Sequence, residues 1–88
     1  MSKKQVPYWE HKNNSINRTI TFKNFIEALD AMNIIGAIAE EMNHHPNWYN
    51  CYNKLEIKLF THDAGEVTKL DYTLAEQINK VLANQYGL

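Results

Sequence analysis

Leu55-Glu56-Ile57-Lys58-Leu59-Phe60-Thr61 is the clearest β-strand pattern in the chain. Three apolar side chains alternate here with two charged ones, so the apolar and charged groups point to opposite faces. A strand of this kind covers a hydrophobic core on one side and meets water on the other. We therefore predict a sheet with one buried face and one open face, and we expect the neighbouring segments to pack around this strand.

Three further strands are predicted before it. Trp48-Tyr49-Asn50-Cys51-Tyr52 leads into it through a tight connection at Asn53-Lys54. Segments 8–10 and 16–22 are expected to pair as a hairpin, because Lys12-Asn13-Asn14 between them has the composition of a turn. Alternation in segment 16–22 places four side chains on one face: Ile16, Arg18, Ile20 and Phe22.

A first helix is predicted over residues 24–43, from apolar residues at three- and four-residue spacing. Asn24 and Glu27 have the spacing of a capping box at its start. Ile34 and Ile38 widen this apolar stripe, so we expect the helix to be buried over more than half of its circumference. Gly36 in its interior costs up to about 1 kcal/mol against alanine, which suggests a close approach by another backbone, in this chain or in a second subunit.

A second helix is expected to begin at the capping box Thr73-Leu74-Ala75-Glu76 and to end near Gly87, which leaves 62–70 as a loop. The element order is then β-β-α-β-β-α. We predict an α+β fold, a two-layer sandwich in which a four-stranded antiparallel sheet carries both helices on one face. The chain is expected to form a single domain over residues 1–88, with residues 1–6 frayed.

Composition excludes several classes of protein and site. The 88 residues carry nine basic and ten acidic groups, a net charge of −1, which lacks the positive excess of a nucleic-acid-binding protein. Cys51 is the single cysteine, so an intrachain disulfide and a cysteine-based zinc site are excluded. We expect a cytoplasmic protein without a signal peptide and without contact with a membrane, because no apolar run is long enough to span one.

Three of the four histidines gather in one region of the sequence. His44 and His45 are expected after the first helix, and His62 just past strand 55–61. An imidazole takes up and releases protons near neutral pH, so this cluster predicts an acid–base site. Glu40 lies four residues before His44 and would bring a carboxylate beside that ring if the helix continues.

Each of these features has a purely structural alternative. Glu40 and His44 could form an ordinary pair at a helix end, and two loop histidines could simply lie at the surface. Three aromatic residues nearby would suit a flat ring substrate, although such a stripe more often belongs to the core: Trp48, Tyr49 and Tyr52. A metal site is not favoured, because adjacent histidines chelate one ion poorly and the spacing matches no helical metal motif.

The spacing across this region resembles the signature of the pterin-4a-carbinolamine dehydratases. The matching positions are Glu40, His44-His45-Pro46, Tyr52, His62 and Asp71. The resemblance covers the chain from about Tyr8 onward and includes Trp9, Phe22-Lys23-Asn24-Phe25 and Thr61-His62-Asp63-Ala64-Gly65. Family members share the β-β-α-β-β-α sandwich. The sequence departs from many members at Glu66, a difference that concerns the conformation of that loop and not the catalytic residues.

The resemblance implies the dehydration of a 4a-hydroxytetrahydropterin to a quinonoid dihydropterin, which recycles the pterin cofactor of aromatic amino acid hydroxylases. It implies no metal and no cofactor, and a homodimer or homotetramer. The implied catalytic residues are His44, His45 and His62, with the last two as the acid–base pair. The implied substrate-binding residues are Trp9, which would stack on the ring, and Glu40, Asn43, Pro46, Thr61, Asp63 and Asp71.

Two other functions remain open from the sequence. One is a non-catalytic module of the same fold that binds a pterin or supports dimerisation and assembly. The other is a branch of the family that serves molybdenum-cofactor metabolism.

Overall fold

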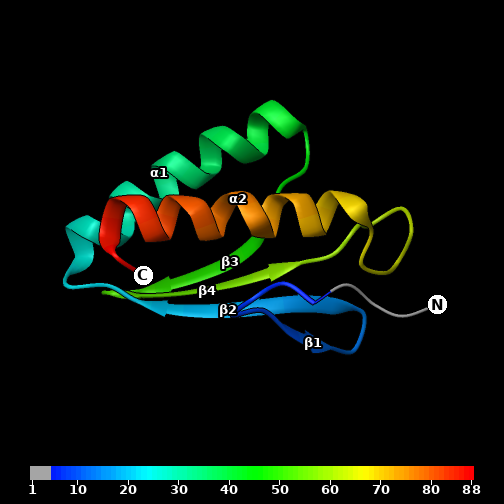
Figure 1. Cartoon of the computed structure of the whole chain (residues 1–88), viewed down its shortest axis with the longest axis horizontal. Helices are drawn as coiled ribbons and strands as arrows, with labels where there is room; N and C mark the ends of the chain where they lie inside the picture. The colour runs from blue at the N-terminus through cyan, green and yellow to red at the C-terminus, as the bar shows by residue number, and fades with distance from the viewer. Residues whose placement is uncertain (1–4) are drawn as a thin grey trace.

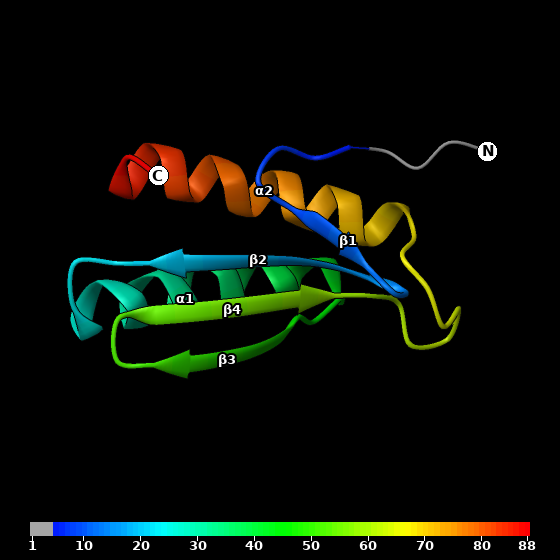
Figure 2. The ribbon, with the colours of Figure 1, turned by 90° about the horizontal axis from the view of Figure 1, so that it is seen from below.

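A four-stranded antiparallel sheet carries two helices on one face in the computed structural model, which describes residues 5–88 (Figure 1). The elements are β1 (Glu10–Lys12), β2 (Ser15–Thr21), α1 (Phe25–Met42), β3 (Asn47–Cys51), β4 (Lys54–Leu59) and α2 (Lys69–Tyr86). The strand order β1-β2-β4-β3 joins the two hairpins through β2 and β4, as the view from below shows (Figure 2). The predicted α+β sandwich is confirmed.

The buried face of the sheet comes from alternation in its two central strands. Leu55, Ile57 and Leu59 of β4 are each at most 1% exposed. Ile16 and Ile20 of β2 lie opposite Leu59 and Leu55 in the antiparallel register, so they join the same buried layer. The residues that alternate with them on the open face are polar or charged: Asn17, Thr19, Glu56 and Lys58.

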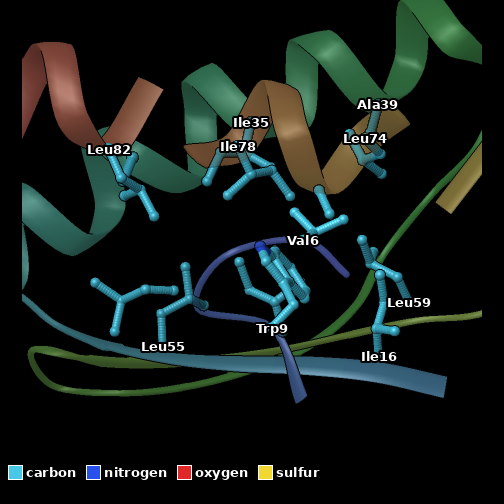
Figure 3. Packing of buried hydrophobic residues seen from close by; sticks show 14 of the residues in the cluster. Val6, Trp9, Ile16, Ile35, Ala39, Leu55, Leu59, Leu74, Ile78 and Leu82 are labelled. Carbon is cyan, nitrogen blue, oxygen red and sulfur yellow. The ribbon is translucent and has the colours of Figure 1, made fainter. Parts of the chain in front are cut away.

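The N-terminal segment belongs to the core. Val6 and Trp9 are 5% and 6% exposed, and both lie between the sheet and the helices (Figure 3). The prediction that residues 1–6 are frayed is therefore wrong for Val6, because a small domain gains stability from every apolar side chain it can bury. Residues 1–4 lie outside the described part of the chain.

One asparagine of α2 ties this segment to the rest of the molecule. The Asn79 Oδ1 accepts hydrogen bonds from the Trp9 indole at 2.8 Å and from the Arg18 guanidinium at 2.6 Å, and its amide donates to the Pro7 carbonyl at 2.9 Å. Arg18 also lies 4.5 Å from the centre of the Tyr8 ring. Burial lowers the pKa of Arg18. These contacts explain how a cation occupies the apolar face of β2.

The first helix begins and ends as predicted. The Asn24 side chain accepts a hydrogen bond from the Glu27 amide at 2.9 Å, and the Glu27 carboxylate accepts one from the Lys23 amide at 3.0 Å. The helix ends at Met42, where Asn43 takes a left-handed conformation with φ 52°. Asparagine is one of the few residues that adopts this conformation readily.

The prediction that α1 is covered over more than half of its circumference is wrong within this chain. Its fully buried positions are mainly alanines, whereas Phe25, Ile26 and Leu29 are 41%, 62% and 39% exposed. Gly36 is not approached by another backbone of the described chain. A Cβ built there would meet the Trp48 indole at 3.9 Å, an ordinary van der Waals contact.

The second helix begins earlier than predicted. Thr68 precedes its first residue, and the Asp71 carboxylate accepts a hydrogen bond from the Thr68 amide at 2.8 Å. Two possible capping sequences lie five residues apart, and the earlier one forms because it also buries Asp71. The predicted end is confirmed, since Gly87 closes the helix with a left-handed φ of 68°.

The strand boundaries also shift slightly. The first strand is Glu10–Lys12 and not 8–10, because the turn lies at Asn13, with φ 56°. In the second hairpin the strand β3 ends at Cys51, and Tyr52 enters the turn with φ 53°. The Asn50 amide holds this turn by donating to the carbonyls of Tyr52 and Lys54.

Candidate active site

Two connections at one end of the molecule bring three histidines together (Figure 1). His44 and His45 lie in the turn after α1, and His62 lies in the loop after β4. They line a hollow of about 450 Å³. The other described residues that line it are Asn43, Pro46, Asn47, Phe60, Thr61, Asp63 and Leu70.

The left-handed turn at Asn43 sends the two adjacent histidines in different directions. His44 turns inward and is 9% exposed, and its Nε2 lies 2.5 Å from the Asp71 Oδ1. His45 stays exposed, and its Nε2 lies 2.7 Å from the Glu40 carboxylate. The predicted pair of Glu40 with His44 is therefore wrong, because the helix has ended before His44 and the turn brings His45 back over the last helical turn.

Asp71 lies beneath the lining of the hollow and holds His44 and Thr61 in place. It is fully buried, and its second oxygen accepts hydrogen bonds from the Thr61 hydroxyl and from the Thr68 amide, each at 2.8 Å. Its place in the first turn of α2 is electrostatically favourable for a carboxylate. One side chain thus joins the turn after α1, the loop after β4 and the start of α2.

His62 lies against an aromatic ring that is not among the predicted site residues. The ring centres of His62 and Phe60 are 4.5 Å apart. Phe60 follows Leu59 in the alternation of β4, so it points to the open face and forms a wall of the hollow. An outward aromatic residue two positions from a histidine was the signal that could have identified it.

Seven of the ten predicted site residues line the hollow, and three do not. Glu40 reaches it only through His45, and Asp71 only through His44 and Thr61. Trp9 lies in the hydrophobic core, bonded to Asn79, and is not brought to the hollow.

The aromatic residues of β3 and of the turn after it do not gather at the histidines as the sequence suggested. Trp48 packs towards Gly36 of α1, and Tyr49 lies on the opposite face of the sheet. Tyr52 lies in the turn at the other end of the hairpin, beside Asn53, whose carbonyl accepts from the Phe22 amide. Such residues pack where the strand direction places them, which is why spacing alone misplaced them.

The hollow is identified by its chemistry more than by its size. Two other hollows in the described chain have volumes of about 420 and 340 Å³, and neither contains a histidine. Among residues 5–88, no group of three or more histidine, cysteine or acidic side chains is arranged to hold a metal ion. Within the same range, neither helix is both long enough and apolar enough to cross a membrane.

Comparison with known proteins assigns this chain to a family. A family model described as pterin 4 alpha carbinolamine dehydratase matches residues 1–81. The chain belongs to this family. Two relatives from Prochlorococcus marinus, strains MIT 9312 and AS9601, carry the name of a pterin-4-alpha-carbinolamine dehydratase. They are 51% and 52% identical over 77 residues, which cover 88% of this chain and 80% of each relative.

Solved structures show the same fold. A transcriptional coactivator/pterin dehydratase from Brucella melitensis has a TM-score of 0.84 and 33% identity, over 86% of this chain and 83% of its own. A pterin dehydratase-like protein described as a RuBisCO assembly factor of the alpha-carboxysome has a TM-score of 0.68 at 15% identity, over 83% and 84%. At that identity the second likeness shows the pterin dehydratase fold alone.

Proposed function

We propose that this protein dehydrates a 4a-hydroxytetrahydropterin to a quinonoid dihydropterin, recycling the pterin cofactor of aromatic amino acid hydroxylases. The observation that carries the proposal is the meeting of three histidines at one hollow, two of them paired with carboxylates. Membership of the family supplies the class of substrate. Relatives named for the same activity, at about half identity, support it.

The reaction needs one acid and one base. The lone pair of the ring nitrogen beside C4a forms a carbon–nitrogen double bond while the bond from C4a to its hydroxyl breaks. The acid protonates the leaving oxygen, which departs as water, and the base takes the proton from the ring nitrogen. Imidazoles perform both tasks near neutral pH, and each task is typically worth about 10²–10⁴-fold in rate.

His45 and His62 are the proposed acid–base pair. Both are exposed to the hollow, so both can reach a bound ring. Glu40 fixes the direction of the His45 ring through the 2.7 Å contact, and Phe60 supports the His62 ring from one side. Orientation of this kind keeps catalytic groups at a productive distance.

The remaining side chains of the hollow bind and position the substrate in this proposal. His44 is held by buried Asp71, so its ring forms a fixed polar wall and contributes little motion. Polar contacts to the pterin come from Asn43, Thr61 and Asp63, and Pro46 shapes the edge. Trp9 is not part of the proposed wall, because it is enclosed in the core.

We also propose that the protein works as a homodimer or homotetramer. Three apolar side chains of α1 remain exposed in the single chain: Phe25, Ile26 and Leu29. A second copy that covered them would remove apolar surface from water.

Dehydration is tested with a freshly generated 4a-hydroxytetrahydropterin, whose decay is followed by its ultraviolet spectrum with and without the protein. The reaction also proceeds spontaneously, so the rates are compared. We expect acceleration that falls by about 10²-fold or more in His45→Gln or His62→Gln. His11→Gln, which changes the fourth histidine outside the hollow, is the matched control. Equal rates with and without correctly folded protein would refute the proposal.

A further inference from the structure

A second hollow, of about 420 Å³, lies next to the histidine hollow. Its lining residues come from the turn between β1 and β2, from the end of β4 and from the loop that follows. These segments lie at the same end of the sheet (Figure 2). The Phe60 side chain lines both hollows. A molecule bound at the histidines could therefore extend past this ring into the second hollow.

The second hollow is basic and rich in hydrogen-bond donors. Lys12 and Lys58 line it, and none of the described residues that line it is acidic. Its amide side chains belong to Asn13, Asn14 and Asn17. Lys58 lies opposite Asn17 in the pairing of β2 with β4, so both point to the same face.

The ammonium group of Lys58 is held towards the shared wall. It lies 5.6 Å from the centre of the Phe60 ring, within the range of a cation–π contact. On its other side, Asn17 pairs with Glu10 of β1. Glu10 does not line the hollow. The two lysines that line the second hollow thus place positive charge beside the histidine hollow.

We propose that this second hollow binds a phosphate monoester carried on the side chain of the pterin, so the preferred substrate is a phosphorylated pterin. The inference rests on the proposed dehydratase function and specifies its substrate class. A phosphate is a compact dianion with several acceptor oxygens, which suits two ammonium groups and neighbouring amide donors. The ring would occupy the histidine hollow while the ester passes over Phe60.

Equilibrium binding of two stable, fluorescent pterins tests this. One is 6-(trihydroxypropyl)pterin and the other is its terminal phosphate monoester. We expect the ester to bind roughly five- to tenfold more tightly, the effect of two partly exposed ion pairs. The preference should shrink at about 0.5 M salt, where charges are screened.

Lysine variants locate the effect. Lys12→Gln and Lys58→Gln should each reduce the preference, and the double variant should abolish it without weakening the neutral pterin. Lys54→Gln is the matched control, because Lys54 lies on the same face of β4 but does not line the hollow. Equal binding of the two pterins, or a preference that survives the double variant, would overturn the proposal.

Two further measurements distinguish a phosphate site from a site for carboxylates and from a failure of the proposed dehydratase function. A pterin with an aminobenzoylglutamate tail carries carboxylates in place of phosphate, and a larger lysine-dependent gain for that compound would overturn the phosphate assignment. The dehydration assay with a neutral side chain tests the proposed function separately. Acceleration of the neutral substrate combined with no preference for the ester would refute only the phosphate site.

Discussion

At the scale of single residues, Asp71 determines the geometry of the site. Its two carboxylate oxygens contact His44, Thr61 and the Thr68 amide, which come from three different segments. A buried carboxylate is costly unless every oxygen is satisfied, and here both oxygens are. The site is therefore held by one residue that does not line the hollow.

Asp71→Asn tests this role. The amide keeps the shape but removes the charge and supplies a donor where the Thr68 amide needs an acceptor. We expect a loss of about 1–3 kcal/mol in the free energy of unfolding, measured with urea, together with slower dehydration. Asp30→Asn, which changes an exposed carboxylate of α1, is the control. Unchanged stability in the Asp71 variant would show that these hydrogen bonds contribute little.

The sequence predicted which residues form the site better than it predicted their partners. Spacing identified His44, His45 and His62, and the structure brings them to one hollow. It misassigned Glu40, because the partner of a residue just past a helix depends on the left-handed turn at Asn43. The left-handed conformation of Asn43 comes directly before the two histidines, and composition does not specify it.

At the scale of elements, α2 holds both the site and the N-terminal segment. Asn79→Ala should cost about 1–3 kcal/mol of stability, because the Trp9 indole and the Arg18 guanidinium lose their shared acceptor. Urea unfolding measures the loss, and Asn84→Ala, at an exposed position of the same helix, should change it by much less. Similar values for the two variants would contradict the proposed tie between α2 and β2.

Tyr86, at the end of α2, is expected to make the free energy of unfolding fall at alkaline pH. Burial raises the pKa of Tyr86, and the carboxylates of Asp30 and Glu27 add to the effect. The folded protein therefore holds this proton more tightly than the unfolded chain. The protonated Tyr86 side chain therefore contributes its full stabilisation below the ordinary tyrosine pKa of about 10. This stabilisation is lost as the pH rises through the raised pKa of Tyr86. Tyr86→Phe should reduce the alkaline loss of stability, whereas Tyr49→Phe, at an exposed position, should retain it.

Elements were predictable where one local pattern dominated. Alternation identified β4, and Asn24 with Glu27 identified the start of α1, because these signals depend on neighbouring residues. The start of α2 was not predictable, since two capping sequences compete and the choice depends on burial of Asp71 by distant segments. Burial of Val6 is likewise a tertiary effect.

At the scale of the whole molecule, the exposed apolar side chains of α1 predict self-association. Leu29→Glu should shift the protein towards the monomer in sedimentation velocity, because a charge would have to be buried at the interface. Ala83→Glu adds the same charge at an exposed position of α2 and should leave the oligomer intact. A native protein that is monomeric at all concentrations would refute the association.

We also propose that the chain folds as one domain, because β2 and β4 join the two hairpins and one cluster of buried residues spans both helices and the sheet. Figure 3 shows members of this cluster from the N-terminal segment, α1, α2 and the strands around a common centre. The histidine hollow lies at the end of this packed unit, on connections that the core holds in place. Rigid support of this kind is what a site built on turns requires.

The rate of 4a-hydroxytetrahydropterin decay in the presence of the His45→Gln/His62→Gln double variant tests the central claim most directly. The claim predicts that the native protein and the His11→Gln control accelerate the decay, while the double variant, folded by circular dichroism, leaves it close to the spontaneous rate. A double variant that accelerates the decay as well as the native protein does would contradict the claim that the histidine hollow performs the dehydration.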